Sequence, residues 1–207
     1  MKPVEEFPAR VVHPDRELYR VHRAVHDPFH FSAAAERGAG GRFDLPADSG
    51  SGSCYLAVSA LGALVETFGR FRVVTVSMVA ERRLATAVPT TSLRLADLTE
   101  RSTLGEYGIT GDISAGIDYR VSQRWAVRFW DAGFDGIYYT ARHDPQFRER
   151  SVALFGSPDD LIDGRHKRFE VTTTPIPAEV VQELTKEFGI PVLPPTPLDD
   201  TDLFPPP

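Results

Sequence analysis

The residues of this sequence that could do chemistry are concentrated between Cys54 and Glu66. The segment begins as a short apolar run typical of a buried strand and changes at Ser59 to the helical spacing of its apolar residues. Serine is one of the residue types that cap the first turn of a helix. We therefore expect Tyr55 on a strand and the carboxylate of Glu66 on the helix that follows. Taken alone, the segment allows Glu66 to be either a solvated surface carboxylate or a functional one.

Two other groups of reactive side chains carry weaker signals. His22, His26 and His30 have a spacing of four residues, which could place metal ligands on one face of a helix. Pro28 interrupts such a helix and no carboxylate has a matching position, so we expect no metal site. Cys54 shows no activating environment in the sequence and is expected to be a small buried hydrophobe.

A glycine-rich segment at 38–41 directly precedes Arg42. It resembles a phosphate-binding loop only loosely, because it lacks the Lys-Ser/Thr ending of such loops. Glycines at these positions would still let the backbone approach a ligand closely. The planar guanidinium of Arg42 is of the kind that matches phosphate oxygens.

Composition excludes several classes of protein. The chain has 207 residues, of which 42% are hydrophobic and 25% charged, as in a soluble globular protein with one core. One cysteine excludes an internal disulfide and a cysteine-based zinc site, and a net charge of −6 argues against sequence-independent nucleic-acid binding. No apolar run approaches the ~20 residues that span a bilayer, and the start does not resemble a signal peptide. We expect no membrane partner, no direct nucleic-acid partner and a cytoplasmic location.

The periodicity of the chain predicts the elements that must position these residues. Strands are expected over the ranges 17–23, 54–58, 72–79, 85–88, 134–140, 151–155 and 168–173. Helices are expected from Ser59 onward, over 122–132 with a stop at Gly133, and over 177–189. Residues 96–99 are expected to form a turn or helix start, and 101–120 a loop with one short helix. The sum is an α+β fold, a single strand-rich domain with helices packed around it.

The two ends of the chain are expected to differ from its body. Residues 1–16 contain three prolines and are expected to be irregular. Residues 176–207 are expected to hold a C-terminal helix followed by a proline-rich, acidic tail. The body of the fold is then the range 17–175.

Six short motifs in a fixed order resemble the RES domain, the toxin part of RES–Xre toxin–antitoxin pairs. The resemblance runs from about Leu18 to Phe155. The motifs are Leu18-Tyr19-Arg20-Val21, Gly41-Arg42-Phe43, the spaced residues of the segment Tyr55–Glu66, Ala96-Asp97-Leu98-Thr99, the segment Gly133–Arg142, and Val152-Ala153-Leu154-Phe155. The range 17–175 is then expected to be a RES-like catalytic domain.

The resemblance implies a fold like that of ADP-ribosyltransferases and an enzyme that consumes NAD. Such toxins cleave the nicotinamide–ribose bond by hydrolysis or phosphorolysis, so NAD is the substrate and neither a bound cofactor nor a metal is required. The family arginine matches Arg20 and the family glutamate matches Glu66. The family serine falls at Thr140, which keeps the hydroxyl and adds a methyl group.

Each of these residue types suits cleavage of that bond. Breaking it builds positive charge on the ribose, and the carboxylate of Glu66 would stabilise this charge. Arg20 and Arg42 would hold the diphosphate. Tyr55 would flank the nicotinamide ring, with Tyr19 in a similar position beside Arg20. Thr140 would bond the nicotinamide ribose or orient Glu66.

Alternatives remain open at this stage. The same site would serve transfer of ADP-ribose to a macromolecule, since only the acceptor differs, and the Thr140 departure also allows an inactive RES-like binding module. The resemblance further implies an Xre-type antitoxin as partner and a homodimeric toxin. The sequence does not distinguish water from phosphate as acceptor, and it assigns no oligomeric state and no role to the C-terminal helix and tail.

Overall fold

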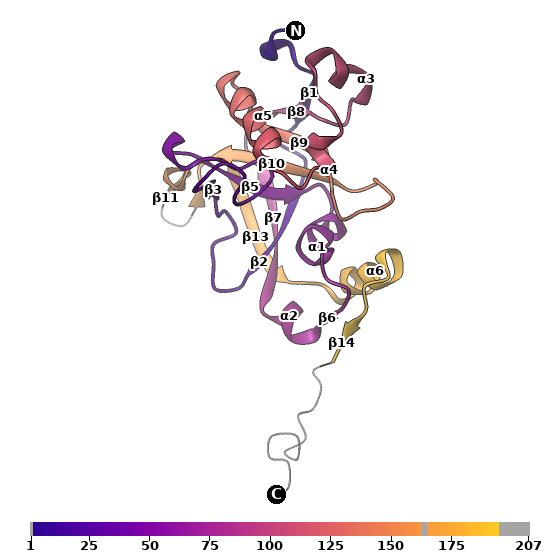
Figure 1. Ribbon diagram of the computed structural model, residues 1–207. Helices are drawn as coiled ribbons and strands as arrows, with labels where there is room; N and C mark the ends of the chain where they lie inside the picture. Colours follow the sequence, from indigo (N-terminus) through magenta and orange to yellow (C-terminus); the bar gives the residue numbers. More distant parts are fainter. Residues whose placement is uncertain (1, 163–164, 195–207) are drawn as a thin grey trace, which may run out of the picture.

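A curled eight-stranded sheet forms the centre of the computed structural model, which describes residues 2–162 and 165–194 (Figure 1). Its strand order is β1-β8-β9-β10-β5-β2-β7-β13, and all neighbours are antiparallel except β8 and β9. The strands are β1 (Ala9–Val12), β2 (Leu18–Arg23), β5 (Gly52–Ala57), β7 (Arg82–Pro89), β8 (Leu93–Asp97), β9 (Gly136–Thr140), β10 (Arg150–Gly156) and β13 (Phe169–Pro175).

Helices lie at both ends of this sheet, with α3, α4 and α5 at one end and α1, α2 and α6 at the other (Figure 1). They are α1 (Ala60–Phe68), α2 (Val76–Ala80), α3 (Arg101–Leu104), α4 (Asp112–Ala115), α5 (Arg120–Asp131) and α6 (Ala178–Phe188). Short 3-10 turns are η1 (Val4–Glu6), η2 (Ala47–Ser49), η3 (Gly105–Tyr107) and η4 (Pro158–Asp160). Three two-stranded ribbons pair β3 (Ala33–Ala34) with β4 (Leu45–Pro46), β6 (Val74–Thr75) with β14 (Val192–Leu193), and β11 (Leu161–Ile162) with β12 (Arg165–His166). Across the described ranges, 2–162 and 165–194, none of these helices has the length and apolar character needed to cross a membrane.

Two apolar helix faces anchor the site-bearing elements to the core. On α1, Leu64, Val65 and Phe68 are fully buried, and they pack in one cluster with Leu184 of α6. On α5, Phe129 is fully buried in a second cluster that also holds Ile137 of β9. Burial of a large apolar side chain contributes about 1.5–3 kcal/mol, so α1 and α5 are rigid supports for what they carry.

The sheet opens between β2 and β5. These two neighbours share one aligned pair, Tyr19 with Ala57, and then diverge. By contrast, β10 pairs with the other side of β5 along its full length, from Ser151–Ala57 to Gly156–Gly52. Side chains that follow the single pair on both strands can therefore line a space between them.

The expected fold class, a single α+β domain, is confirmed. Strands are found where they were predicted to begin near residues 17, 54, 85, 134, 151 and 168, and their observed ends differ from the predicted ends by at most three residues. Ser59 caps α1 as expected, since its hydroxyl accepts a hydrogen bond from the N–H of Gly62 at 2.8 Å. Gly133 follows the end of α5 with φ of +75°, a left-handed conformation that favours glycine.

The strand predicted over 72–79 is wrong. Only Val74 and Thr75 form a strand, β6, and the chain then turns into α2. The Thr75 hydroxyl accepts a hydrogen bond from the N–H of Met78 at 3.2 Å and so caps this helix. β-branched residues favour strands only weakly, and here the cap and tertiary packing override that preference.

The predictions for the chain ends and for 96–99 also need correction. Residues 9–12 are not irregular: they form β1, which pairs with β8 and so extends the sheet. Ala96 and Asp97 belong to β8 and not to a helix start, because this strand is held between β1 and β9. The C-terminal helix is found as α6, whereas 195–207 lie outside the described residues. The boundaries at 17 and 175 stay a prediction.

Candidate active site

A cavity of about 440 Å³ opens where β2 and β5 diverge. Strands β2 and β5, helix α1, the loop before β4 and the loop after β9 all contribute to its wall. The lining residues are Tyr19, Arg20, Val21, Gly40, Gly41, Arg42, Tyr55, Leu56, Ala63, Glu66, Thr67, Arg70, Tyr119, Tyr139, Arg142 and His143. The cavity therefore gathers residues from positions 19 to 143 of the sequence.

Helix α1 turns one face toward this cavity. Ala63, Glu66 and Thr67 line it at spacings of three and four residues, which place side chains on one face of a helix, and Arg70 lines it from the turn after α1. The opposite face holds the buried apolar stripe of α1. The surface interpretation of Glu66 is thus excluded by its orientation, and Arg70 joins it one turn further along.

The Glu66 carboxylate is held by a hydroxyl group from the sheet. Ser151 of β10, which is fully buried, donates a hydrogen bond to Glu66 Oε1 at 2.9 Å. Tyr139 of the neighbouring strand β9 lines the same cavity and also acts on the ionisation of Glu66. Burial raises the pKa of Glu66 above its ordinary value, while the Ser151 hydrogen bond, the charge of Arg42 and the Tyr139 hydrogen bond oppose this rise.

Arg42 presents an unsatisfied cationic group to the cavity. The residue is 8% exposed, its Nη1 donates to the carbonyl of Ile113 at 3.3 Å, and its guanidinium lies 4.8 Å from the ring centre of Tyr119. Its buried Nη2 has no hydrogen-bond partner in the part of the chain that the structure describes. Burial lowers the pKa of Arg42 below its usual value. A buried, unpaired donor is costly, so this group fits an anionic ligand.

The loop that carries Arg42 is clamped from two sides. Gln123 of α5 accepts from the N–H of Gly38 at 2.7 Å and donates to the carbonyls of Ala39 and Gly41 at 2.7 and 3.1 Å. The buried carboxylate of Asp44 accepts from the N–H of Gly41 at 2.7 Å. These bonds fix the backbone that leads into Arg42.

The loop has no room for a side chain at position 41. A Cβ at Gly41 would lie 2.5 Å from the Tyr55 hydroxyl and 2.6 Å from Asp44 Oδ1. The sequence predicted a close approach of this backbone to a ligand. In the structure, Gly41 instead allows the loop to pack closely against Tyr55 and Asp44. The Tyr55 hydroxyl is already occupied, because it donates to Asp44 at 2.7 Å and accepts from the N–H of Phe43 at 2.9 Å. Tyr55 can thus offer its ring, but not a free hydroxyl, to a ligand.

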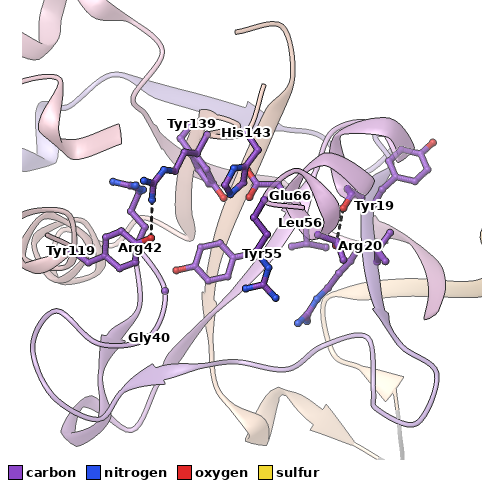
Figure 2. Close-up of a pocket in the computed structure, with 16 residues that line it drawn as sticks. Tyr19, Arg20, Gly40, Arg42, Tyr55, Leu56, Glu66, Tyr119, Tyr139 and His143 are labelled. Carbon is purple, nitrogen blue, oxygen red and sulfur yellow. Dashed lines mark hydrogen bonds between the residues drawn. The ribbon is translucent and has the colours of Figure 1, made fainter. Parts of the chain in front are cut away.

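Burial raises the pKa of Tyr55 well above its usual value, and the Asp44 charge adds to this effect. The phenol is therefore protonated throughout the physiological pH range. In Figure 2, its ring lies centrally, with Arg42 and Tyr119 on one side and Arg20 on the other.

Arg20 and Tyr19 differ in their relation to the cavity. Arg20 lines it while its Nη1 donates to the carbonyl of Pro28 and to Cys54 Sγ, the latter at 2.8 Å. The Tyr19 hydroxyl donates to Glu17, and its ring points away from Glu66 (Figure 2). Tyr19 thus contributes to the wall without directing its hydroxyl into the site.

Thr140 is not brought to the cavity. It follows Tyr139 on β9, and successive side chains of a strand point to opposite faces, so Tyr139 faces Glu66 and Thr140 does not. The hydroxyl group that reaches Glu66 from a serine or threonine is that of Ser151. The roles predicted for Thr140 therefore have no support in the geometry.

Two arginines and a histidine of the site were not predicted from the sequence: Arg70, Arg142 and His143. Arg142 donates to the Tyr119 hydroxyl at 3.0 Å, and burial lowers the pKa of His143. Both belong to a loop organised by the buried Asp144, which accepts backbone N–H bonds from Gln146, Arg148 and Glu149. Helical spacing from Glu66 could have identified Arg70, whereas the loop residues carry no pattern of their own.

The charge balance of the cavity is strongly positive. Among its described lining residues, Glu66 is the sole carboxylate, and the same wall carries Arg20, Arg42, Arg70 and Arg142. This arrangement can bind an anion and place one carboxylate beside it. Within the described ranges, no three histidine, cysteine or carboxylate side chains gather as a metal site, and the Nδ1 of His22 contacts the carbonyl oxygens of Arg23 and His26.

A chain of the crystal structure of the M. tuberculosis MbcT–MbcA toxin–antitoxin complex has the same fold. The TM-score is 0.56 at 20% sequence identity, and the match covers 85% of this chain and 89% of that one. No protein of curated function matches the sequence. The model of the RES domain family matches residues 17–177, which is more than half of the sequence. The chain described here belongs to the RES domain family.

Proposed function

We propose that this protein cleaves the nicotinamide–ribose bond of NAD, which it consumes as a substrate. The observation that carries the proposal is the placement of Glu66 as the sole carboxylate among the described lining residues of a strongly cationic cavity. When the bond breaks, nicotinamide leaves with the electron pair and positive charge develops on the ribose. A carboxylate fixed beside that ribose lowers the barrier by stabilising this charge.

The cationic wall suits the diphosphate of the same substrate. Arg42 offers its unpartnered Nη2 on one side of the Tyr55 ring, and Arg20 lies on the other (Figure 2). A guanidinium forms charge-assisted hydrogen bonds with phosphate oxygens, and these bonds are stronger when the group is desolvated. Arg70 and Arg142 add positive charge to the same cavity. We assign substrate binding to these arginines and to the aromatic ring of Tyr55.

The acceptor of the ADP-ribosyl group distinguishes three reactions at one site. Water would give ADP-ribose, inorganic phosphate would give its 1-phosphate, and a macromolecule would become modified. The arginines next to Glu66 would favour an anionic acceptor such as phosphate, because they would offset its charge as it approaches. No step of the proposed reaction requires a metal or a bound cofactor.

The biological role proposed here is that of a toxin neutralised by an antitoxin. Family membership and the fold shared with a chain of a toxin–antitoxin complex support it. An Xre-type antitoxin, a homodimeric assembly and action in the cytoplasm are parts of the same proposal. Expression of the chain alone should arrest growth while cellular NAD falls, and co-expression of a cognate antitoxin should restore both. Unchanged growth and NAD on expression of soluble protein would refute the toxin role.

The direct test is nicotinamide release by the purified protein, measured with and without inorganic phosphate. Wild-type protein should release nicotinamide, and Glu66→Gln should reduce the rate by about 100-fold or more, since it removes the charge that stabilises the transition state. Glu106→Gln is a matched control, because Glu106 is exposed and bonds Lys2 outside the cavity. NAD left intact under both conditions would refute the enzymatic proposal.

NAD carrying a label on its adenosine part separates the acceptors. Free labelled ADP-ribose indicates hydrolysis, its phosphate ester indicates phosphorolysis, and label bound covalently to protein or nucleic acid indicates transfer. If NAD binds without any cleavage, the chain is a RES-like binding module.

A further inference from the structure

The Glu66 carboxylate is held across the sheet, by groups far from it in the sequence. Ser151 lies on β10 and is fully buried, and its hydroxyl is 2.9 Å from Glu66 Oε1. Tyr139 lies on the neighbouring strand β9, is 5% exposed, and helps to lower the pKa of the carboxyl group. In the sheet these two residues are directly paired, Ser151 with Tyr139. Ser151 and Tyr139 thus lie side by side on one face of the sheet, and the Ser151 hydroxyl bonds the carboxylate.

We propose that Ser151 is a positioning residue of this site and that, together with Tyr139, it fixes the Glu66 carboxylate in the orientation that the reaction needs. Thr140, the residue that the sequence suggested for this task, does not line the cavity. The inference relies on the proposed function for its kinetic readout only, because the contact itself can be tested without NAD.

The physical need for such a pair follows from the surroundings of Glu66. Its neighbours on α1 are apolar except Thr67, whose hydroxyl bonds the carbonyl of Ala63, and the cavity next to it is lined by arginines. Without a fixed donor, the side chain could rotate and form an ion pair with Arg70, which lines the same cavity from the turn after α1. The Ser151 hydroxyl opposes that rotation, because the residue is fully buried on a strand that is paired on both sides.

The same pair also determines how readily Glu66 ionises. Burial raises its pKa, and the hydrogen bonds from Ser151 and Tyr139, with the Arg42 charge, counteract this. Removal of the Ser151 hydroxyl should therefore move the titration of Glu66 to higher pH. The other charged and titratable groups of the cavity wall, the arginines, His143 and the buried Tyr55, are unchanged in such a variant.

The test compares Ser151→Ala, Ser151→Thr and Tyr139→Phe with wild type. Loss of a hydrogen bond to a charged group should lower kcat by about 10- to 100-fold with little change in KM, and the acidic limb of the pH–rate profile should move to higher pH. Ser151→Thr retains the hydroxyl and should recover most of kcat. Independently of NAD, the carbon-13 signal of the Glu66 carboxyl should titrate at higher pH in Ser151→Ala than in wild type.

Thr99→Val is the matched control, because Thr99 donates its hydroxyl to the buried carboxylate of Asp97 at 2.6 Å, outside the cavity. It should alter neither kcat nor the Glu66 titration. Thr140→Val tests the rival residue and should lower kcat less than Ser151→Ala does.

The proposal is overturned if Glu66 titrates in Ser151→Ala as in wild type, or if Thr140→Val, and not Ser151→Ala, reduces kcat. If wild-type protein leaves NAD intact, the proposed function fails, but the titration still decides the role of Ser151. Should Ser151→Ala not fold, the titration of Glu66 in Ser151→Cys decides in the same way, because a thiol is a much weaker hydrogen-bond donor than a hydroxyl.

Discussion

Truncation of Gln123 to alanine should loosen the loop that carries Arg42. Gln123 is 6% exposed on α5, and its side-chain amide makes three hydrogen bonds with the backbone of the glycine-rich loop. All three lie within 3.1 Å and connect residues more than eighty positions apart in the sequence. No helix or strand spans 36–44, so these bonds and those of Asp44 replace regular secondary structure there.

The expected loss of stability follows from those contacts. A hydrogen bond between neutral groups contributes about 0.5–1.5 kcal/mol net, so three bonds give an upper range of about 1.5–4.5 kcal/mol. The freed loop can reach water, which returns part of this energy. We expect Gln123→Ala to lower the free energy of unfolding by about 2 kcal/mol. Because Arg42 follows the loop directly, the KM for NAD should rise about 10-fold, while kcat changes little since Glu66 is held elsewhere.

Urea unfolding and NAD-cleavage kinetics measure the two effects separately. Gln123→Glu keeps the acceptor for the N–H of Gly38 but loses both donors, so it should not restore stability. Gln182→Ala, on the exposed side of α6, is the control for the substitution itself. A Gln123→Ala variant within about 0.5 kcal/mol of wild type and with unchanged KM would refute the reasoning.

Three further predictions concern charge and space at the site. Burial raises the pKa of Glu66, so its contribution to stability is full below the ordinary glutamate pKa of about 4.3 and is lost as pH rises through the folded value. Glu66→Gln should therefore have a higher Tm than wild type at pH 8 and a smaller advantage at pH 4. A difference in Tm between variant and wild type that is the same at both pH values would contradict this prediction. Burial opposes ionisation of Asp144, but three backbone N–H donors lower its pKa, so the stability it provides is present above about pH 3.9 and disappears as pH falls through the folded value. Asp144→Ala should cost about 2–4 kcal/mol in urea unfolding at pH 7 and progressively less as the pH falls below about 3.9, and a pH-independent cost would count against it. Gly41→Ala should separate Tyr55 from Asp44, lower stability by about 1–3 kcal/mol and raise KM, whereas a variant with wild-type Tm and KM would show that the loop yields without cost.

Local patterns of the sequence were sufficient for the α1 segment. A short apolar run gives way to helical spacing at Ser59, which caps α1 in the structure, and a glutamate seven positions later must lie on a definable face of that helix. What spacing could not decide was whether that face meets solvent or a cavity. The answer depends on β2 diverging from β5, a property of strand pairing across the sheet.

The opposite case is the strand predicted over 72–79. Its β-branched residues favour a strand, but the strand partner of β6 is β14, more than one hundred residues away, and it pairs with two residues only. With so short a ladder, the Thr75 cap and the packing of α2 decide the conformation. The β propensity of this segment does not determine its structure, because no described strand pairs with residues 76–79.

The sequence by itself determined the fold class, most strands and helices, the capping of α1, and the residue types Arg20, Arg42, Tyr55 and Glu66 that line the cavity. These features depend on local periodicity and on the order of motifs, and both are properties of the sequence itself. Only the tertiary structure decided that Ser151, and not Thr140, holds the carboxylate, since hydrogen bonds form between atoms that the sheet brings together and not between positions close in sequence. A shift of one residue along a strand reverses which side chains face the site, and that register is set by long-range pairing.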